Sequence, residues 1–193
     1  MKKISTLFKK DPKDLGLVTT EVSPENDWVI KGEGIATRKW DGIATAIMDG
    51  CLFKRYDVKK GRTAPIGAIP CQEPDEITGH HPHWVKCERT NPADKYFFMA
   101  FDSLEDKSEG TYELISDNFQ GRHSKKNPEN ITGHKLIKHG VESFELNDLS
   151  FEAIKAFICN PDNDVEGIVF HHKTDGRMCK IKKSNFGVLR YKI

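Results

Sequence analysis

The chain has 193 residues, of which 37% are apolar and 31% are charged, and its formal net charge is +1. This length and composition fit one globular domain with a sizeable core and exclude a disordered chain. No segment approaches the roughly 20 apolar residues of a membrane-spanning helix, and the apolar centre of the N-terminus is too short for a secretion signal. We therefore expect a single domain over 1–193 in a cytoplasmic monomer that does not enter a membrane.

The cysteines and the charge distribution further restrict the class of protein. Five cysteines without the spacing of a disulfide framework indicate reduced thiols. Between residues 171 and 193, seven Lys or Arg stand against one acidic residue. Such an end fits a polyanion or a bound phosphate, or else a solvated cationic tail. A second basic stretch spans 119–139 and contains Arg122, Lys125, Lys126, Lys135 and Lys138.

The first 26 residues are polar and are interrupted by Pro12, Gly16 and Pro24. Because these residues break regular structure, we expect a leader segment. Within it, the sequence favours one short helical turn near Leu7 and Phe8.

Lys39 lies between two stretches of β-forming residues. Residues 28–30 and 35–37 precede it and 43–48 follow it, with Asp41-Gly42 forming a turn between the two stretches. A lysine packed against sheet walls loses hydration, which favours the neutral, nucleophilic amine near neutral pH. The alternative is a solvated lysine in a surface hairpin, since Lys-x-Asp-Gly is a short pattern.

A second hairpin is predicted at Asp49-Gly50, which separates 43–48 from the β-forming run 51–57. Its second strand carries Lys54 and Arg55. We expect both side chains to lie within reach of anything bound at Lys39.

A long segment rich in Gly and Pro runs from residue 59 to residue 92. A loop of this length inside a domain is typically functional or mobile. It contains His80, His81, His83 and Cys87, which raises the hypothesis of a zinc site. We disfavour zinc because these residues do not form the paired clusters of a structural zinc site.

The next elements alternate between strands and one helix. Residues 96–101 read as a buried strand, and 111–115 read as a strand carrying Glu113. That carboxylate is either solvent-facing or a ligand for a ribose hydroxyl or a metal. Ser150 can cap a helix over 151–158 that ends at Asn160-Pro161.

Two strands, 165–170 and 178–182, are predicted beyond this helix, joined by a turn through Asp175-Gly176. Lys180 and Lys182 are two residues apart and therefore project from one face of their strand. Placing two partly buried lysines side by side is costly unless an anion lies between them, and a phosphate is the natural candidate.

Five short motifs occur in order: Lys39-Trp40-Asp41-Gly42, Lys54-Arg55, Tyr112-Glu113-Leu114-Ile115, residues 166–170 and residues 180–183. They resemble motifs I, Ia, III, IV and V of the covalent nucleotidyltransferases, the superfamily of DNA ligases, RNA ligases and mRNA capping enzymes. Residues 67–75, 78–84 and 138–140 are similar to the small ATP-dependent 5′-to-3′ RNA ligases typified by the vertebrate enzyme. This resemblance explains the His-rich loop without zinc.

The resemblance implies an α+β nucleotidyltransferase domain in which antiparallel sheets with few helices enclose the nucleotide. It implies that Lys39 attacks the α-phosphate of ATP, releases pyrophosphate and holds AMP as a lysyl phosphoramidate. AMP then passes to the 5′-phosphate of an RNA, and a 3′-hydroxyl displaces it to seal the strand.

The resemblance also assigns the groups around the phosphates. Lys180 and Lys182 would hold the α-phosphate, and Arg55 would hold the ribose or a phosphate edge. Glu113 would bind the ribose or a metal. Glu166 would lie near Mg²⁺ or Mn²⁺, hard ions that suit carboxylate and phosphate oxygens.

Thr37 and Arg38 would meet the adenine edge, and His139 and Phe144 are both candidates for stacking on the ring. Only 11 residues follow Lys182 in this sequence. We therefore expect no oligonucleotide-binding-fold domain of the kind found in capping enzymes, which leaves RNA binding to the catalytic domain itself.

Two other functions fit the same residues. One is a minimal DNA ligase. The other is a non-catalytic RNA-binding or nucleotide-binding module that has kept the fold and lost the chemistry. The joint presence of Lys39, Glu113, Glu166, Lys180 and Lys182 argues against the second, because a module that only binds does not need the nucleophile.

Overall fold

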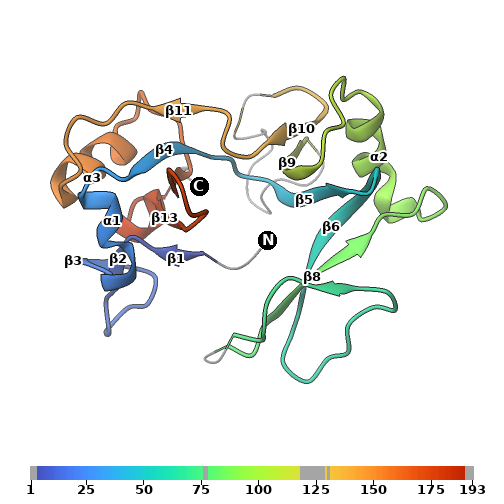
Figure 1. Cartoon of the computed structure of the whole chain (residues 1–193), viewed down its shortest axis with the longest axis horizontal. Coiled ribbons are helices and arrows are strands. Elements are labelled where there is room, and N and C mark those ends of the chain that lie inside the picture. Colours follow the sequence, from blue (N-terminus) through green and yellow to red (C-terminus); the bar gives the residue numbers. More distant parts are fainter. Residues whose placement is uncertain (1–3, 76–77, 118–128, 130, 190–193) are drawn as a thin grey trace. The chain divides into compact units, whose positions relative to one another are not determined.

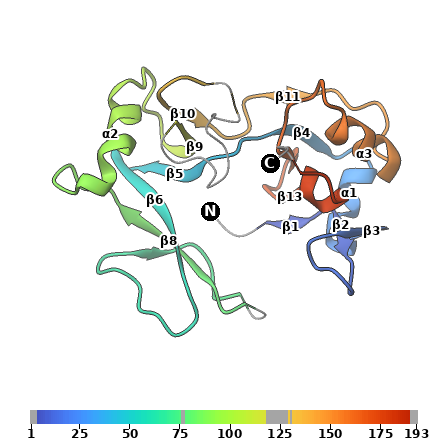
Figure 2. The ribbon, with the colours of Figure 1, turned by 180° about the vertical axis from the view of Figure 1, so that it is seen from behind.

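The computed structural model describes residues 4–75, 78–117, 129 and 131–189, and its chain divides into two compact units (Figures 1 and 2). Unit 1 comprises the described part of 41–139, and unit 2 comprises 4–40 together with 140–189. Both units combine mostly antiparallel sheets with few helices, which confirms the expected α+β class. The expectation of a single domain over 1–193 stays a prediction, and each unit is described by itself.

Unit 2 is built on a five-stranded sheet with the order β1-β13-β12-β4-β11. The strands are β1 (Ser5–Thr6), β4 (Gly34–Lys39), β11 (Ser143–Phe144), β12 (Gly167–His172) and β13 (Met178–Lys182). All neighbours pair antiparallel except β1 and β13, which are parallel. This unit also contains the hairpin β2 (Phe8–Lys10) and β3 (Val18–Val22), and the helices α1 (Asp27–Ile30) and α3 (Phe151–Cys159).

One face of this sheet forms the core of unit 2. Ala36, Ile168 and Ile181 pack there against Ile154 and Ile158 of α3, and the four isoleucines are fully buried. The α3 helix begins where expected, because the Ser150 hydroxyl accepts a hydrogen bond from the backbone N–H of Ala153. Since side chains alternate along a strand, the opposite face of the sheet takes the remaining residues of β4, β12 and β13.

The expected leader over 1–26 is wrong for its described residues. Leu7 and Phe8 are at most 1% exposed and belong to the core of unit 2, with Phe8 in β2 rather than in a helical turn. The Leu7 amide donates to the carbonyl of Lys180, which continues the line of β1 along β13. Burial of these two large side chains overrides the polar character of the surrounding sequence.

Residues 28–30 are also not extended, because they lie in α1.

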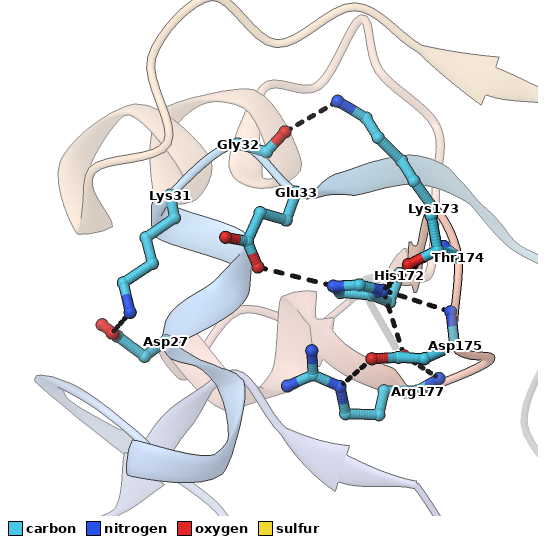
Figure 3. Close-up of polar contacts among 9 residues, drawn as sticks. All are labelled: Asp27, Lys31, Gly32, Glu33, His172, Lys173, Thr174, Asp175 and Arg177. Atoms are coloured by element: carbon cyan, nitrogen blue, oxygen red, sulfur yellow. Dashed lines mark hydrogen bonds and ion pairs between the residues drawn. The ribbon is translucent and has the colours of Figure 1, made fainter.

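A polar network fixes this helix and the loop after it to the turn beyond β12 (Figure 3). The His172 ring lies between the carboxylates of Glu33 and Asp175, at 3.4 and 3.0 Å, and Lys173 donates to the carbonyl of Gly32. We assign this network to stability.

Unit 1 contains a six-stranded antiparallel sheet with the order β10-β9-β5-β6-β8-β7. The strands are β5 (Ile43–Met48), β6 (Cys51–Val58), β7 (Ile69–Pro70), β8 (His81–Lys86), β9 (Gly110–Ser116) and β10 (His134–Lys138). The predicted hairpin between β5 and β6 is confirmed. Asp49 and Gly50 both have positive φ, 48° and 68°, as a tight two-residue hairpin turn requires.

The predicted strand over 96–101 is wrong, because these residues form α2 (Lys95–Asp102). The Asn91 side chain accepts the N–H of Ala93 and starts a helical turn that leads into α2. Phe97 and Ala100, spaced for one helix face, then pack on Leu52 and Leu114 in the core of unit 1. None of the described helices has the length and apolar character that crossing a membrane requires.

Candidate functional site

The polar face of the unit 2 sheet carries four of the residues singled out in the sequence. Across it, Lys39 of β4, Gly167 of β12 and Lys182 of β13 stand opposite one another in one row. The next row on the same face joins Thr37, Val169 and Lys180. Directly paired residues of neighbouring strands point to the same side, so the register gathers Thr37, Lys39, Lys180 and Lys182 on this face.

Lys39 forms an ion pair with Glu166, which lies immediately before β12. The Lys39 Nζ contacts Oε2 of Glu166 and also lies 3.5 Å from the carbonyl oxygen of Trp40. The side chains are 22% and 20% exposed, respectively. The amine is thus partly buried, and its charge is compensated by a carboxylate that the resemblance had placed near a metal.

Gly167 permits this arrangement because a larger residue does not fit. A Cβ at this position would lie 2.1 Å from the carbonyl oxygen of Ile181 and 2.8 Å from the Cα of Lys182. The close approach of β12 to β13 therefore requires glycine between Lys39 and Lys182.

Lys10, which the sequence had not singled out, interacts electrostatically with Lys182. Burial lowers the pKa of Lys10 from its ordinary value, and the charge of Lys182 lowers it further, while Asp14 opposes the shift. Two lysines that oppose each other's charge favour an anion between them. The chain reaches Lys10 in β2 directly after β1, which pairs with β13, so the sequence around Lys10 alone does not reveal this interaction.

The structure separates Arg38 from Lys39. Arg38 is paired with Ile168 and therefore lies on the opposite face of β4. Its guanidinium pairs with Glu142 at 3.3 Å and donates to the carbonyl of Asp164 at 2.7 Å. Thr37 is 2% exposed and donates to the carbonyl of Val169. An adenine contact by Thr37 or Arg38 stays a prediction, and we leave Arg38 out of the proposed site.

Phe144 does not extend the polar face. It is paired with Ala36 and packs edge-on against Phe157 of α3, with ring centroids 5.1 Å apart. Both contacts place it on the core side of the unit 2 sheet. Stacking of Phe144 on an adenine stays a prediction.

In unit 1, Glu113 of β9 is the centre of a second polar cluster. Its Oε1 accepts the backbone N–H of Gly42 at 3.0 Å, and its Oε2 lies 2.9 Å from Nε2 of His139. The His139 Nδ1 lies 2.9 Å from the hydroxyl of Thr111. His139, a candidate for stacking on adenine, thus has both ring nitrogens engaged within this cluster.

Arg55 lies on the same sheet face as Glu113, and Lys54 lies on the other. Arg55 contacts Asp57 at 3.0 Å, and its side chain is 18% exposed. Lys54 is paired with the carboxylate of Asp94, which is 1% exposed beneath α2. The two residues of the Lys54-Arg55 motif therefore differ, because Lys54 lies on the core side of the sheet and Arg55 lies on the side of Glu113.

The expected loop over 59–92 is wrong in part, because His81 and His83 belong to strand β8. Their rings are in contact, with centroids 4.2 Å apart. Within the described ranges, no three His, Cys, Asp or Glu side chains gather as a metal-binding group. Of the basic stretch 119–139, Arg122, Lys125 and Lys126 lie outside the described residues. Lys135 and Lys138 belong to β10.

No protein-family model matches the chain, and no curated protein matches it in a sequence comparison.

Proposed function

We propose that the chain is an ATP-dependent RNA ligase with a nucleotidyltransferase fold, joining 5′-phosphate and 3′-hydroxyl ends through lysyl-AMP and RNA-adenylate. The observation that supports this most is the polar face of unit 2. There Lys39, with the Glu166 carboxylate in contact, shares one sheet face with Lys180 and Lys182. A nucleophile beside a proton acceptor and two cations is what a displacement at phosphorus requires.

In the first step, Lys39 Nζ loses a proton, and the Glu166 oxygen in contact with it is placed to take that proton. The nitrogen then forms a bond to the α-phosphorus of ATP. The bond from this phosphorus to the bridging oxygen breaks, and pyrophosphate leaves. In the later steps AMP passes to the RNA 5′-phosphate, and the 3′-hydroxyl displaces it.

Lys180 and Lys182 supply the electrostatic part of catalysis. Each step develops negative charge on phosphoryl oxygens, so cations fixed in advance lower the barrier more than a strong base would. Arg55 belongs to unit 1, and its contact with a ribose or phosphate edge stays a prediction.

Glu166 also fits a divalent cation, because its partly exposed carboxylate offers the hard oxygens that such ions prefer. Mg²⁺ or Mn²⁺ bound there would neutralise charge on the phosphoryl oxygens. Both Glu113 oxygens already accept hydrogen bonds. We therefore give Glu113 an orienting role, and its binding of a ribose or a metal stays a prediction.

The decisive experiment is transfer of label from α-labelled ATP to the protein in Mg²⁺ or Mn²⁺. The wild type should form a labelled adduct that is lost in Lys39→Ala and in Lys39→Arg, because Arg keeps the charge and is not nucleophilic. Lys31→Ala, which alters an exposed lysine of the same unit, should be labelled like the wild type. Absence of an adduct with every metal and nucleotide tried would reject the proposal.

The two alternatives have their own readouts. A nicked duplex with either RNA or DNA on the 3′-hydroxyl side separates an RNA ligase from a minimal DNA ligase. Tight RNA binding that is unchanged in Lys39→Ala, together with no sealing by the wild type, would support a non-catalytic binding module.

A further inference from the structure

The chain passes between the two units at Trp40–Asp41 and again at His139–Gly140. On the unit 1 side, one carboxylate holds both passages. Glu113 accepts the N–H of Gly42, just after the first passage, and contacts the ring of His139, just before the second. We call this set the Glu113 clasp, made of Gly42, Thr111, Glu113 and His139.

The clasp is well packed. The side chains of Glu113 and His139 are 11% and 20% exposed. A Cβ on Gly42 would lie 2.2 Å from the carbonyl oxygen of Leu114, so the backbone of Gly42 lies directly against β9. The hydrogen bonds of the clasp are therefore largely shielded from competing water.

His139 is itself held at two points. Its backbone N–H donates to the carbonyl of Thr111 at 3.0 Å, and its Nδ1 lies 2.9 Å from the Thr111 hydroxyl. These contacts fix the ring and direct Nε2 at Glu113 Oε2. With Oε2 held, the Glu113 carboxylate is left with one orientation, in which Oε1 faces Gly42.

We propose that His139 is a positioning residue that orients Glu113 and through it holds the backbone at Gly42, three residues after the nucleophile Lys39. Residues 39–42 are one continuous run, in which Lys39 pairs with Gly167 and the Asp41 N–H donates to Glu129. The bond from Gly42 to Glu113 is a further support of this run, and its loss loosens the chain that follows the nucleophile. A misplacement of about 1 Å can cost about 100-fold in rate. The kinetic part of this inference rests on the proposed ligase function, and the structural part does not.

Two matched variants test whether the contact of His139 Nε2 with Glu113 is the one that the positioning role requires. His139→Gln can place an amide N–H near the position of Nε2 and so keep the contact with Glu113. His139→Asn reaches only the position of Nδ1. At saturating ATP, we expect His139→Asn and His139→Ala to adenylate Lys39 about 10- to 100-fold more slowly, with His139→Gln near the wild-type rate. The Kd for ATP should change less than about threefold, because the loss is one of alignment rather than of binding.

A second readout does not depend on activity. Amide hydrogen exchange by NMR should show the Gly42 N–H protected in the wild type and in His139→Gln. It should exchange faster in His139→Asn and His139→Ala, while amides in the middle of β9 stay protected. Urea denaturation of each variant serves as the folding control.

The outcomes separate the two proposals. If the wild type forms no adduct, the ligase proposal fails, and Gly42 exchange still tests the clasp. If the adduct forms and His139→Asn matches the wild type in rate and in Gly42 exchange, the positioning role is overturned. It is also overturned if His139→Gln is as defective as His139→Asn, or if protection falls throughout β9, which would show a structural role alone.

Discussion

At the residue scale, the ion pair with Glu166 determines the electrostatic environment of Lys39. A lysine at the end of a strand could be a solvated surface group, but its side chain is only 22% exposed and its amine is paired with a carboxylate. Both charges are therefore compensated before any nucleotide arrives. Binding of ATP would place the α-phosphate against a nucleophile whose proton acceptor is already in contact.

Replacing Glu166 with Gln should destabilise the protein, because it leaves the Lys39 ammonium partly buried without its counter-charge. We expect a loss of about 1–3 kcal/mol in the free energy of unfolding, between the values for exposed and buried pairs. The double variant Lys39→Met with Glu166→Gln should recover part of this loss. Urea denaturation near neutral pH compares both variants with the wild type.

The matched control is Glu21→Gln, which removes the carboxylate of the exposed pair with Lys9. Side chains in that pair are 48% and 67% exposed, so water screens the two charges and the loss should be smaller than for Glu166→Gln. Equal unfolding midpoints for Glu166→Gln and the wild type would contradict the assigned role of the Lys39–Glu166 pair.

At the scale of elements, sequence patterns predicted strands well where polar and apolar residues alternate or where a turn is diagnostic. The strands over 35–37, 43–48, 51–57, 111–115 and 178–182 are confirmed. Period two also placed Lys180 and Lys182 correctly on one face. The patterns failed at 96–101, because a short apolar run is equally compatible with a buried strand and a buried helix.

The candidate site depended on register, which the sequence does not contain. Lys39 and Glu166 are 127 positions apart, and only the pairing of β4 with β12 brings them together. Lys10 was missed for the same reason, since its electrostatic interaction with Lys182 joins two distant parts of the chain. Arg38 lies on the other face of β4 from its neighbour Lys39, and its contact with the adenine edge stays a prediction.

Substitution of Gly167 by Ala should disrupt the central element of unit 2. The added Cβ would meet backbone atoms of Ile181 and Lys182, which cannot move without separating β12 from β13. We expect a loss of about 3 kcal/mol or more in the free energy of unfolding. Gly176→Ala, in the turn after the same strand, adds a Cβ in open space at a φ of 75° and should cost only about 1 kcal/mol. Similar urea midpoints for the two variants would refute this account of Gly167.

At the scale of the whole molecule, the positive charge is local rather than general. The formal net charge is only +1, so long-range attraction cannot account for binding of a polyanion. The attraction for a polyanion would have to come from lysines on the polar face of unit 2. Lys10, which interacts electrostatically with Lys182, would add to them. Each unit has its own core, so a surface substitution on unit 2 can weaken this binding without unfolding unit 1.

Binding of single-stranded RNA with a 5′-phosphate should therefore depend on salt only moderately. If Lys10, Lys180 and Lys182 contact phosphates, the logarithm of the binding constant should fall with the logarithm of salt concentration with a slope of about −2. Lys182→Ala should make this slope less negative by about 0.7, because one phosphate contact is lost. Lys31→Ala should leave the slope unchanged, since its exposed ammonium pairs with Asp27 on α1. Fluorescence anisotropy over a range of salt concentrations measures all three, and an equal slope for Lys182→Ala and the wild type would place the RNA on another surface.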